Sequence, residues 1–246
     1  MAGDLALSFK GVTKTYSRSH LGRTTYTRGV EDLNLEVRLG EAFGLLGLNG
    51  SGKTTAFKLA LGLLKATDGQ IAILGLSPCD PKAYSQIGFL PELPYFYSFL
   101  TPEEALRFYG RLSGLSDEAM SSRIPEVLKS VGLSSQSRRT MGELSKGTVQ
   151  RVGLAQAILH DPKLIILDEP VSGLDPLAVK EFRDILLSLN EEGKSLIISS
   201  HSISELEKLC HRVAILKEGR LVRILEQREW QEAQAGLEGL FVETVR

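Results

Sequence analysis

The sequence has few cysteines, no long apolar run and almost no net charge, and each of these absences excludes a class of protein. Its 246 residues include only two cysteines, Cys79 and Cys210, without disulfide or zinc spacing, so we expect a reducing cytoplasm. No stretch approaches the roughly 18 apolar residues of a membrane-spanning helix, and the first ten residues do not have the pattern of a signal peptide. The formal net charge of -1 gives no general attraction for nucleic acid.

What the sequence does contain is a sizeable apolar fraction, 42%, arranged as short strands that alternate with helical stretches. This alternation predicts an α/β fold with a parallel sheet covered on both faces. The helical stretch over residues 101–159 interrupts the sheet and is expected to form an inserted subdomain, in which Pro125 lies in the first turn of a helix or kinks it. We expect residues 17–28 to form an exposed loop. Residues after Gln227 are expected to form a solvated tail, which Trp230 could dock back.

Residues 47–54 match the phosphate-loop pattern G-x-x-x-x-G-K-[ST], between a short apolar strand and a helix. Glycines let successive backbone N–H groups converge on an anion, and the helix N-terminus adds a partial positive charge. Lys53 would reach the β- and γ-phosphates, and the hydroxyl of Thr54 would hold Mg²⁺. The pattern by itself indicates only nucleotide binding. The predicted nucleotide-binding residues here are Gly47, Asn49, Gly50, Ser51, Gly52, Lys53, Thr54 and Thr55.

An apolar strand at residues 164–167 ends in two carboxylates, Asp168 and Glu169. Adjacent residues at the end of a strand point to opposite sides, so the two acids can act differently. We expect Asp168 to bind Mg²⁺, directly or through water, and Glu169 to polarise the water that attacks the γ-phosphate.

With these motifs in order, the chain resembles the nucleotide-binding domains of ABC transporters over roughly residues 5–225. The segment Leu144-Ser145-Lys146-Gly147-Thr148-Val149-Gln150-Arg151 resembles the family signature, which precedes the acid strand. A serine hydroxyl and free N–H groups at a helix N-terminus make a second anion site. The resemblance implies that two subunits pair head to tail in the presence of ATP. Ser145 and Gly147 of one subunit then contact the γ-phosphate held by the phosphate loop of the other.

The resemblance assigns roles to further residues. The segment Ser172-Gly173-Leu174-Asp175 is similar to the D-loop, which connects the two sites of the dimer. His201 is similar to the switch histidine that contacts the γ-phosphate, and Tyr16 to the aromatic residue that stacks on adenine. The implied catalytic residues are Glu169, His201 and Lys53.

The sequence departs from the family pattern at two places. Glu92 stands where the family usually has a glutamine that touches Mg²⁺, so its metal contact is left open. Lys146 replaces the first signature glycine, and Thr148 replaces a common glutamine. Lys146 could add positive charge near the partner's phosphates, or it could act only as a spacer.

Taken together, the sequence predicts a P-loop NTPase (RecA-like) core with an N-terminal antiparallel β subdomain and an inserted helical subdomain at about residues 92–160. The ATPase domain would span residues 1–227, followed by a tail over residues 228–246. The function that the resemblance implies is an ATP-hydrolysing subunit that uses Mg²⁺ and forms a homodimer on a separate integral membrane permease. By the same resemblance it would work in export and be peripheral to the cytoplasmic face of the plasma membrane.

Two alternative functions are weaker. A soluble ABC protein acting on nucleic acid or ribosomes generally needs tandem domains, coiled-coil insertions or basic arms. A catalytically inactive regulatory subunit conflicts with the presence of Lys53, Asp168, Glu169 and His201. The aromatic residues between Glu92 and Thr101 could pack among themselves or form a groove for a permease helix.

Overall fold

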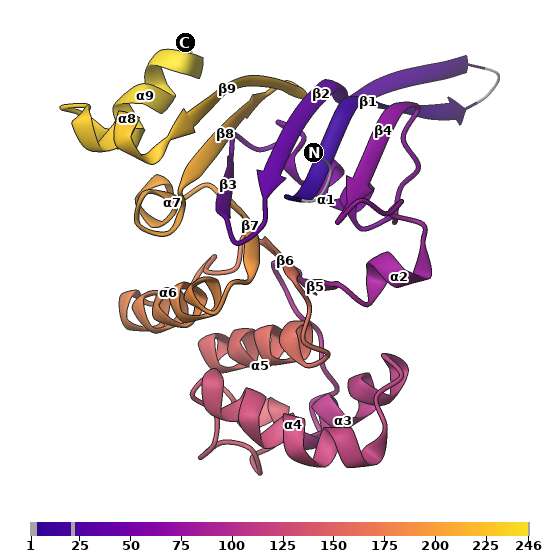
Figure 1. Cartoon of the computed structure of the whole chain (residues 1–246), viewed down its shortest axis with the longest axis vertical. Helices are drawn as coiled ribbons and strands as arrows, with labels where there is room; N and C mark the ends of the chain where they lie inside the picture. Colours follow the sequence, from indigo (N-terminus) through magenta and orange to yellow (C-terminus); the bar gives the residue numbers. More distant parts are fainter. Residues whose placement is uncertain (1–3, 21–22, 246) are drawn as a thin grey trace. The chain divides into compact units, whose positions relative to one another are not determined.

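The computed structural model describes residues 4–20 and 23–245, and the chain divides into two compact units. Unit 1 is formed by Met1–Tyr84 with Ser195–Arg246, and unit 2 by Ser85–Lys194. Each unit combines strands with helices (Figure 1), so the predicted α/β class is confirmed.

Unit 1 contains an antiparallel sheet, ordered β2-β1-β4, and a second group of strands, ordered β7-β3-β8-β9. In the second group β3 pairs in parallel with β7 and β8, and β9 adds antiparallel to β8. Every residue of β3 and β7 is buried, as expected for central strands of a parallel sheet. The strands are β1 (Leu5–His20), β2 (Arg23–Arg38), β3 (Ala42–Leu46), β4 (Asp68–Ile73), β7 (Ser195–Ser200), β8 (Arg212–Lys217) and β9 (Arg220–Glu226).

The predicted loop over residues 17–28 is wrong in conformation. Strands β1 and β2 continue through most of it as an antiparallel hairpin, in which Ser17 pairs with Tyr26. Tyr26 is 74% exposed. The strand pattern was missed because a ribbon exposed on both faces lacks the alternation of apolar and polar residues that marks a half-buried strand.

The predicted solvated tail is also wrong. It forms α8 and α9, which follow β9, and α9 packs against α7 and β8 within unit 1. Trp230 and Leu237 are buried, so the predicted docking through Trp230 is confirmed. The helices of unit 1 are α1 (Lys53–Ala60), α2 (Pro81–Tyr84), α7 (Ile203–Leu209), α8 (Gln227–Glu232) and α9 (Gly236–Val245).

Unit 2 contains a pair of parallel strands, β5 and β6, and a group of helices in which α5 packs against β5 while α3 and α4 pack against α5 and each other. The capping box at Thr101 and Glu104 opens α3 as predicted. Pro125 lies well inside α4, neither in its first turn nor at its end, because the helix begins after Ser116, whose side chain caps it. The elements are β5 (Ile87–Leu90), α3 (Pro102–Leu112), α4 (Asp117–Ser130), α5 (Lys146–Ile158), β6 (Leu164–Asp168) and α6 (Pro176–Glu191).

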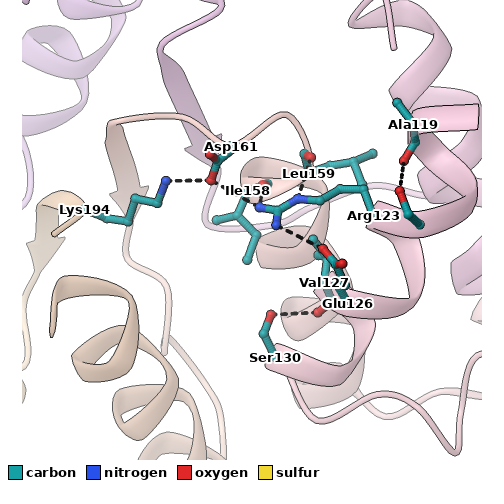
Figure 2. Close-up of polar contacts among 10 residues, drawn as sticks. Ala119, Arg123, Glu126, Val127, Ser130, Ile158, Leu159, Asp161 and Lys194 are labelled. Carbon is teal, nitrogen blue, oxygen red and sulfur yellow. Dashed lines mark hydrogen bonds and ion pairs between the residues drawn. The ribbon is translucent and has the colours of Figure 1, made fainter. Parts of the chain in front are cut away.

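A cluster of polar contacts ties α4 to the end of α5 (Figure 2). Arg123 donates to the carbonyl oxygens of Leu159 and Ile158, at 3.2 and 3.3 Å, and its guanidinium also lies 3.3 Å from Asp161. Asp161 in turn pairs with Lys194 at 2.7 Å. The arginine thereby satisfies helix-terminal carbonyls just before the strand that carries the acid pair.

Candidate functional site

The phosphate-loop prediction falls at the end of β3, where the backbone itself requires glycine. A Cβ at Gly47 would collide with the side chain of Ser51 and lie 2.5 Å from the carbonyl oxygen of Leu216. Gly52 has φ +107° and lies so close to the carbonyl oxygen of Gly29 that a Cβ would be 2.8 Å away. Residues 47–52 therefore form a backbone cradle in which the positions of Gly47 and Gly52 leave no room for a side chain.

Lys53 curls back over this cradle. Its Nζ donates to the carbonyl oxygen of Gly47 at 2.6 Å and lies 3.4 Å from that of Leu48. Ser51 Oγ is buried and, within the described part of the chain, has no hydrogen-bond partner. A buried cation and an unpaired hydroxyl in a glycine cradle suit a phosphate group, so these residues fit the phosphates of ATP.

The turn between β8 and β9 braces the cradle, and this contact was not predicted from the sequence. Glu218 and Gly219 both have positive φ, as a tight hairpin turn needs. The N–H of Gly219 donates to the carbonyl oxygen of Ser51 at 3.0 Å, and its carbonyl oxygen accepts from Glu31. Glu31 also pairs with Arg220 at 2.7 Å, which lowers the pKa of Glu31.

Tyr16 lies beside the first turn of α1. Its hydroxyl is 3.2 Å from Thr55 Oγ1. Its ring lies against Gly29, where an added Cβ would be only 2.7 Å from a ring carbon. The ammonium of Lys14 lies 5.6 Å from the ring centroid. Tyr16 is thus held close to the phosphate loop, with 37% of its surface exposed. The glycine at position 29 makes this packing possible.

His201 directly follows the carboxyl end of β7, and the phosphate loop directly follows the carboxyl end of the neighbouring strand β3. In the parallel pairing of these strands, Leu46 lies opposite Ser200, so Gly47 and His201 leave the sheet side by side. The carboxyl ends of parallel strands are the usual location of ligand sites in such sheets. Unit 1 therefore brings together the phosphate loop, Tyr16 and His201.

In unit 2 the acid pair stands at the end of β6. Asp168 is the last residue of the strand, and Glu169 has φ +48°, a left-handed conformation that is unfavourable for a residue with a side chain. A turn follows, in which the N–H of Ser172 donates to the carbonyl oxygen of Glu169 at 3.1 Å. Backbone strain of this kind concentrates at functional positions.

Glu92 lies at the same end of the paired strands, since Leu90 is opposite Leu167 and both acids come two residues later. Its carboxylate accepts a hydrogen bond from Ser172 Oγ at 3.2 Å. In the described residues, no group of three acidic, histidine or cysteine side chains is arranged to hold a metal. Mg²⁺ often keeps several water ligands and uses substrate phosphates, so one or two protein ligands suffice.

The signature residues have structural functions of their own. Ser145 caps α5, accepting from the N–H of Thr148 at 3.3 Å, and its hydroxyl lies 2.8 Å from that of Thr148. At Gly147 a Cβ would be 3.1 Å from the Cβ of Ala178 on α6. Their predicted contact with a partner's nucleotide thus remains a proposal.

The segment between Glu92 and Thr101 exposes several large apolar side chains. Tyr95 and Phe99 are 79% and 71% exposed, and Tyr97 stacks on Phe99 with 5.5 Å between ring centroids. Phe96 instead is buried and contacts Tyr109 edge to face. The segment therefore packs through Phe96 while its other aromatic residues face outward. Among the described residues, no helix combines the length and apolarity needed to cross a membrane.

Comparison with known proteins matches residues 30–172 to the family model described as ABC transporter. An uncharacterized ABC transporter ATP-binding protein of Synechocystis is 40% identical over 218 residues, 86% of this chain. The chain spans 62% of that relative's length, and 57% of that of a Nostoc relative. The bacitracin transport ATP-binding protein BcrA of Enterococcus faecalis is 39% identical over 90% of this chain and 70% of its own.

The fold has close counterparts among solved structures. A dimeric, post-hydrolysis state of an ATP-binding cassette bound to ADP and Pi superposes with a TM-score of 0.79 and 27% identity. The match covers 90% of this chain and 99% of that one. The predicted fold class is thereby confirmed.

Proposed function

The chain belongs to the ABC transporter family as one of its ATP-binding cassettes, and we propose that it hydrolyses ATP to drive transport through a separate membrane permease. The observation that carries this proposal is the glycine cradle of residues 47–52, with the buried Lys53 over it and the unpaired hydroxyl of Ser51 inside it. The related cassette that was solved with ADP and Pi supports ATP as the substrate of this site.

Each proposed site residue has a distinct task. Lys53 exchanges its carbonyl partners for the β- and γ-phosphates, and Tyr16 offers a ring face to adenine. Thr54 and Asp168 hold Mg²⁺, which supplies charge neutralisation at the phosphates when bound. Glu169 polarises the attacking water and His201 contacts the γ-phosphate.

Replacement of Glu169 tests the hydrolytic step. Because a positioned base contributes about 10²–10⁴-fold to a rate, Glu169→Gln should retain ATP binding and lose turnover by about that factor. Binding of a fluorescent ATP analogue and release of phosphate measure the two properties separately. Near-normal phosphate release by the variant would remove Glu169 from the role of base.

A head-to-tail homodimer is the proposed working state. It is supported by the related cassette that was solved as a dimer with ADP and Pi. It is also supported by the second helix N-terminus at Ser145, for which one nucleotide bound at the phosphate loop has no use. In this dimer Ser145 and Gly147 act on the nucleotide of the partner.

The outward aromatic side chains of residues 93–99 are the proposed contact with the permease at the cytoplasmic face of the plasma membrane. Exposed apolar patches of this kind mark interaction sites. The name of the bacitracin transport relative supports a role in transport, and export is the proposed direction. Recovery of a membrane subunit by co-purification in mild detergent tests the assignment, whereas recovery of ribosomes or DNA would favour the nucleic-acid alternative.

Two aromatic replacements separate docking from packing. Tyr95→Ala with Phe99→Ala should weaken recovery of the permease and leave basal phosphate release unchanged, because both rings face outward. Phe96→Ala is the matched control, since Phe96 is buried and its loss should lower stability. If the exposed pair lowers stability as much as Phe96→Ala does, the segment serves packing alone.

A further inference from the structure

Two of the three residues by which this chain departs from the ABC pattern, Glu92 and Lys146, contact one and the same residue, Ser172. Lys146 Nζ donates to the carbonyl oxygen of Ser172 at 2.7 Å, and Ser172 Oγ donates to Glu92 Oε1 at 3.2 Å. We propose that Glu92, Ser172 and Lys146 form a positioning relay that holds Glu169 in place, and that Glu92 serves this relay rather than Mg²⁺.

Lys146 stands at a position where a positive charge is unfavourable unless a specific group binds it. Lys146 is the first residue of α5, and a cation at a helix N-terminus opposes the helix dipole, with no acidic residue in that first turn to offset it. Its ammonium instead reaches the turn after β6 and occupies the space next to Gly173, where a Cβ would lie 2.6 Å from Nζ. The lysine and this glycine therefore fit together, and the contact fixes the turn to α5.

The relay ends at the proposed catalytic base. The N–H of Ser172 donates to the carbonyl oxygen of Glu169 at 3.1 Å, closing a turn over residues 169–172 that starts with the left-handed Glu169 and is followed directly by the left-handed Gly173. A strained turn keeps its conformation only where its surroundings hold it. Ser172 is held through its carbonyl by Lys146 and through its hydroxyl by Glu92. These two contacts hold Glu169 at its unfavourable φ.

The charges of the two departures are complementary. Glu92 is an acid where the family has a neutral amide, and Lys146 is a base where the family has glycine. Each charged group strengthens its own hydrogen bond to Ser172 relative to a neutral one. Glu92 Oε1 is directed at Ser172, which assigns this carboxylate to orientation of the turn. The assignment rests on the proposed function, because Glu169 acts as a base only if the chain hydrolyses ATP.

A double-mutant cycle tests the Glu92 part of the relay. Glu92→Ala and Ser172→Ala each remove the same hydrogen bond, and Ser172→Ala keeps the carbonyl that Lys146 uses. Each variant should lower kcat about fivefold with KM for ATP unchanged, and the double variant should be no slower than either single variant. The Mg²⁺ concentration for half-maximal rate should stay the same in all three. Glu92→Gln, which retains an acceptor, should recover most of the rate.

Three results would overturn the relay: unchanged kcat in the single variants, multiplying losses in the double variant, or a raised Mg²⁺ requirement in Glu92→Ala alone. The last result would make Glu92 a metal contact. Lys146→Met tests the other part, with a similar loss of kcat expected and recovery by Lys146→Arg; a normal rate in Lys146→Met would remove Lys146 from the relay.

The matched control is Ser137→Ala, since within the described residues the Ser137 hydroxyl makes only a local bond, to the carbonyl oxygen of Ser134. Its kcat should equal that of the unmodified chain. Thermal unfolding of every variant shows whether a loss of rate reflects a loss of fold. If the unmodified chain releases no phosphate from ATP, the proposed function fails. If it releases phosphate but the losses of kcat multiply in the double variant, only the relay fails.

Discussion

The backbone N–H of Gly219 donates to the carbonyl oxygen of Ser51 at 3.0 Å, which joins the hairpin turn of β8 and β9 to the phosphate loop. A segment far along the chain thus fixes the conformation of the loop that holds Lys53. The loop is preorganised in part by residues outside its own motif.

Gly219→Ala should therefore weaken nucleotide binding. Gly219 has φ +82°, and a Cβ would lie 3.0 Å from the carbonyl oxygen of Gly29, so alanine should cost about 1–2 kcal/mol and displace the turn from Ser51. Titration of a fluorescent ATP analogue should show a several-fold weaker affinity. The matched control is Gly40→Ala, with φ +69° and no heavy atom within 4 Å of a Cβ. Equal losses of affinity in both variants would refute the bracing role.

Trp230→Ala should destabilise the protein. Trp230 is 2% exposed, and truncation of a buried tryptophan typically costs about 3–5 kcal/mol of unfolding free energy. Denaturant unfolding followed by circular dichroism measures the loss. Trp230→Phe should lose less unfolding free energy, because phenylalanine fills much of the space of the tryptophan. It also removes an indole N–H that is buried without a partner among the described residues. A loss of unfolding free energy below about 1 kcal/mol in Trp230→Ala would instead support the prediction of a solvated tail.

His160 should make stability depend on pH near neutrality. Burial lowers the pKa of His160 from its ordinary 6.5, opposed in part by its hydrogen bond to the carbonyl oxygen of Ile87 and by Asp161. The unfolded chain therefore binds the proton more readily than the folded one. This contribution to stability is complete above the unfolded pKa and is lost as pH falls through the lower, folded pKa.

The unfolding free energy should accordingly decrease from about pH 8 to about pH 5, and His160→Gln should reduce that decrease. The carboxyl groups of Glu104 and Asp161 have lowered pKa values, so they affect stability in a more acidic range. An identical pH dependence in the variant would contradict the account of His160.

Much of the fold was predictable because local patterns and the final structure agree. The capping box at Thr101, the glycine-rich turn before Lys53 and the apolar strand before Asp168 each specify their element through neighbours in sequence. The two errors share a cause. Exposure on both faces hides a strand pattern in the hairpin of β1 and β2. The charged residues around Trp230 hide the apolar face of the terminal helices.

The candidate site was predictable only where a motif is continuous. Contacts such as Ser51 to Gly219, or Glu92 to Ser172, join residues far apart in the chain, and no spacing rule indicates them. The signature motif predicts an anion site at Ser145, whereas the structure shows that the Ser145 hydroxyl accepts from the N–H of Thr148 and caps its own helix. Such contacts depend on packing, which a single sequence does not display.

The central claim, hydrolysis of ATP at a site shared by two copies of this chain, is tested most directly by mixing two inactive variants. Lys53→Met removes the ammonium group that should contact the phosphates of ATP. Ser145→Arg blocks the signature segment that should contact the nucleotide of the partner. Random pairing makes half of the dimers mixed, each with one intact site, so phosphate release should recover to about a quarter of the rate of the unmodified chain. A mixture as inactive as its components would contradict the account.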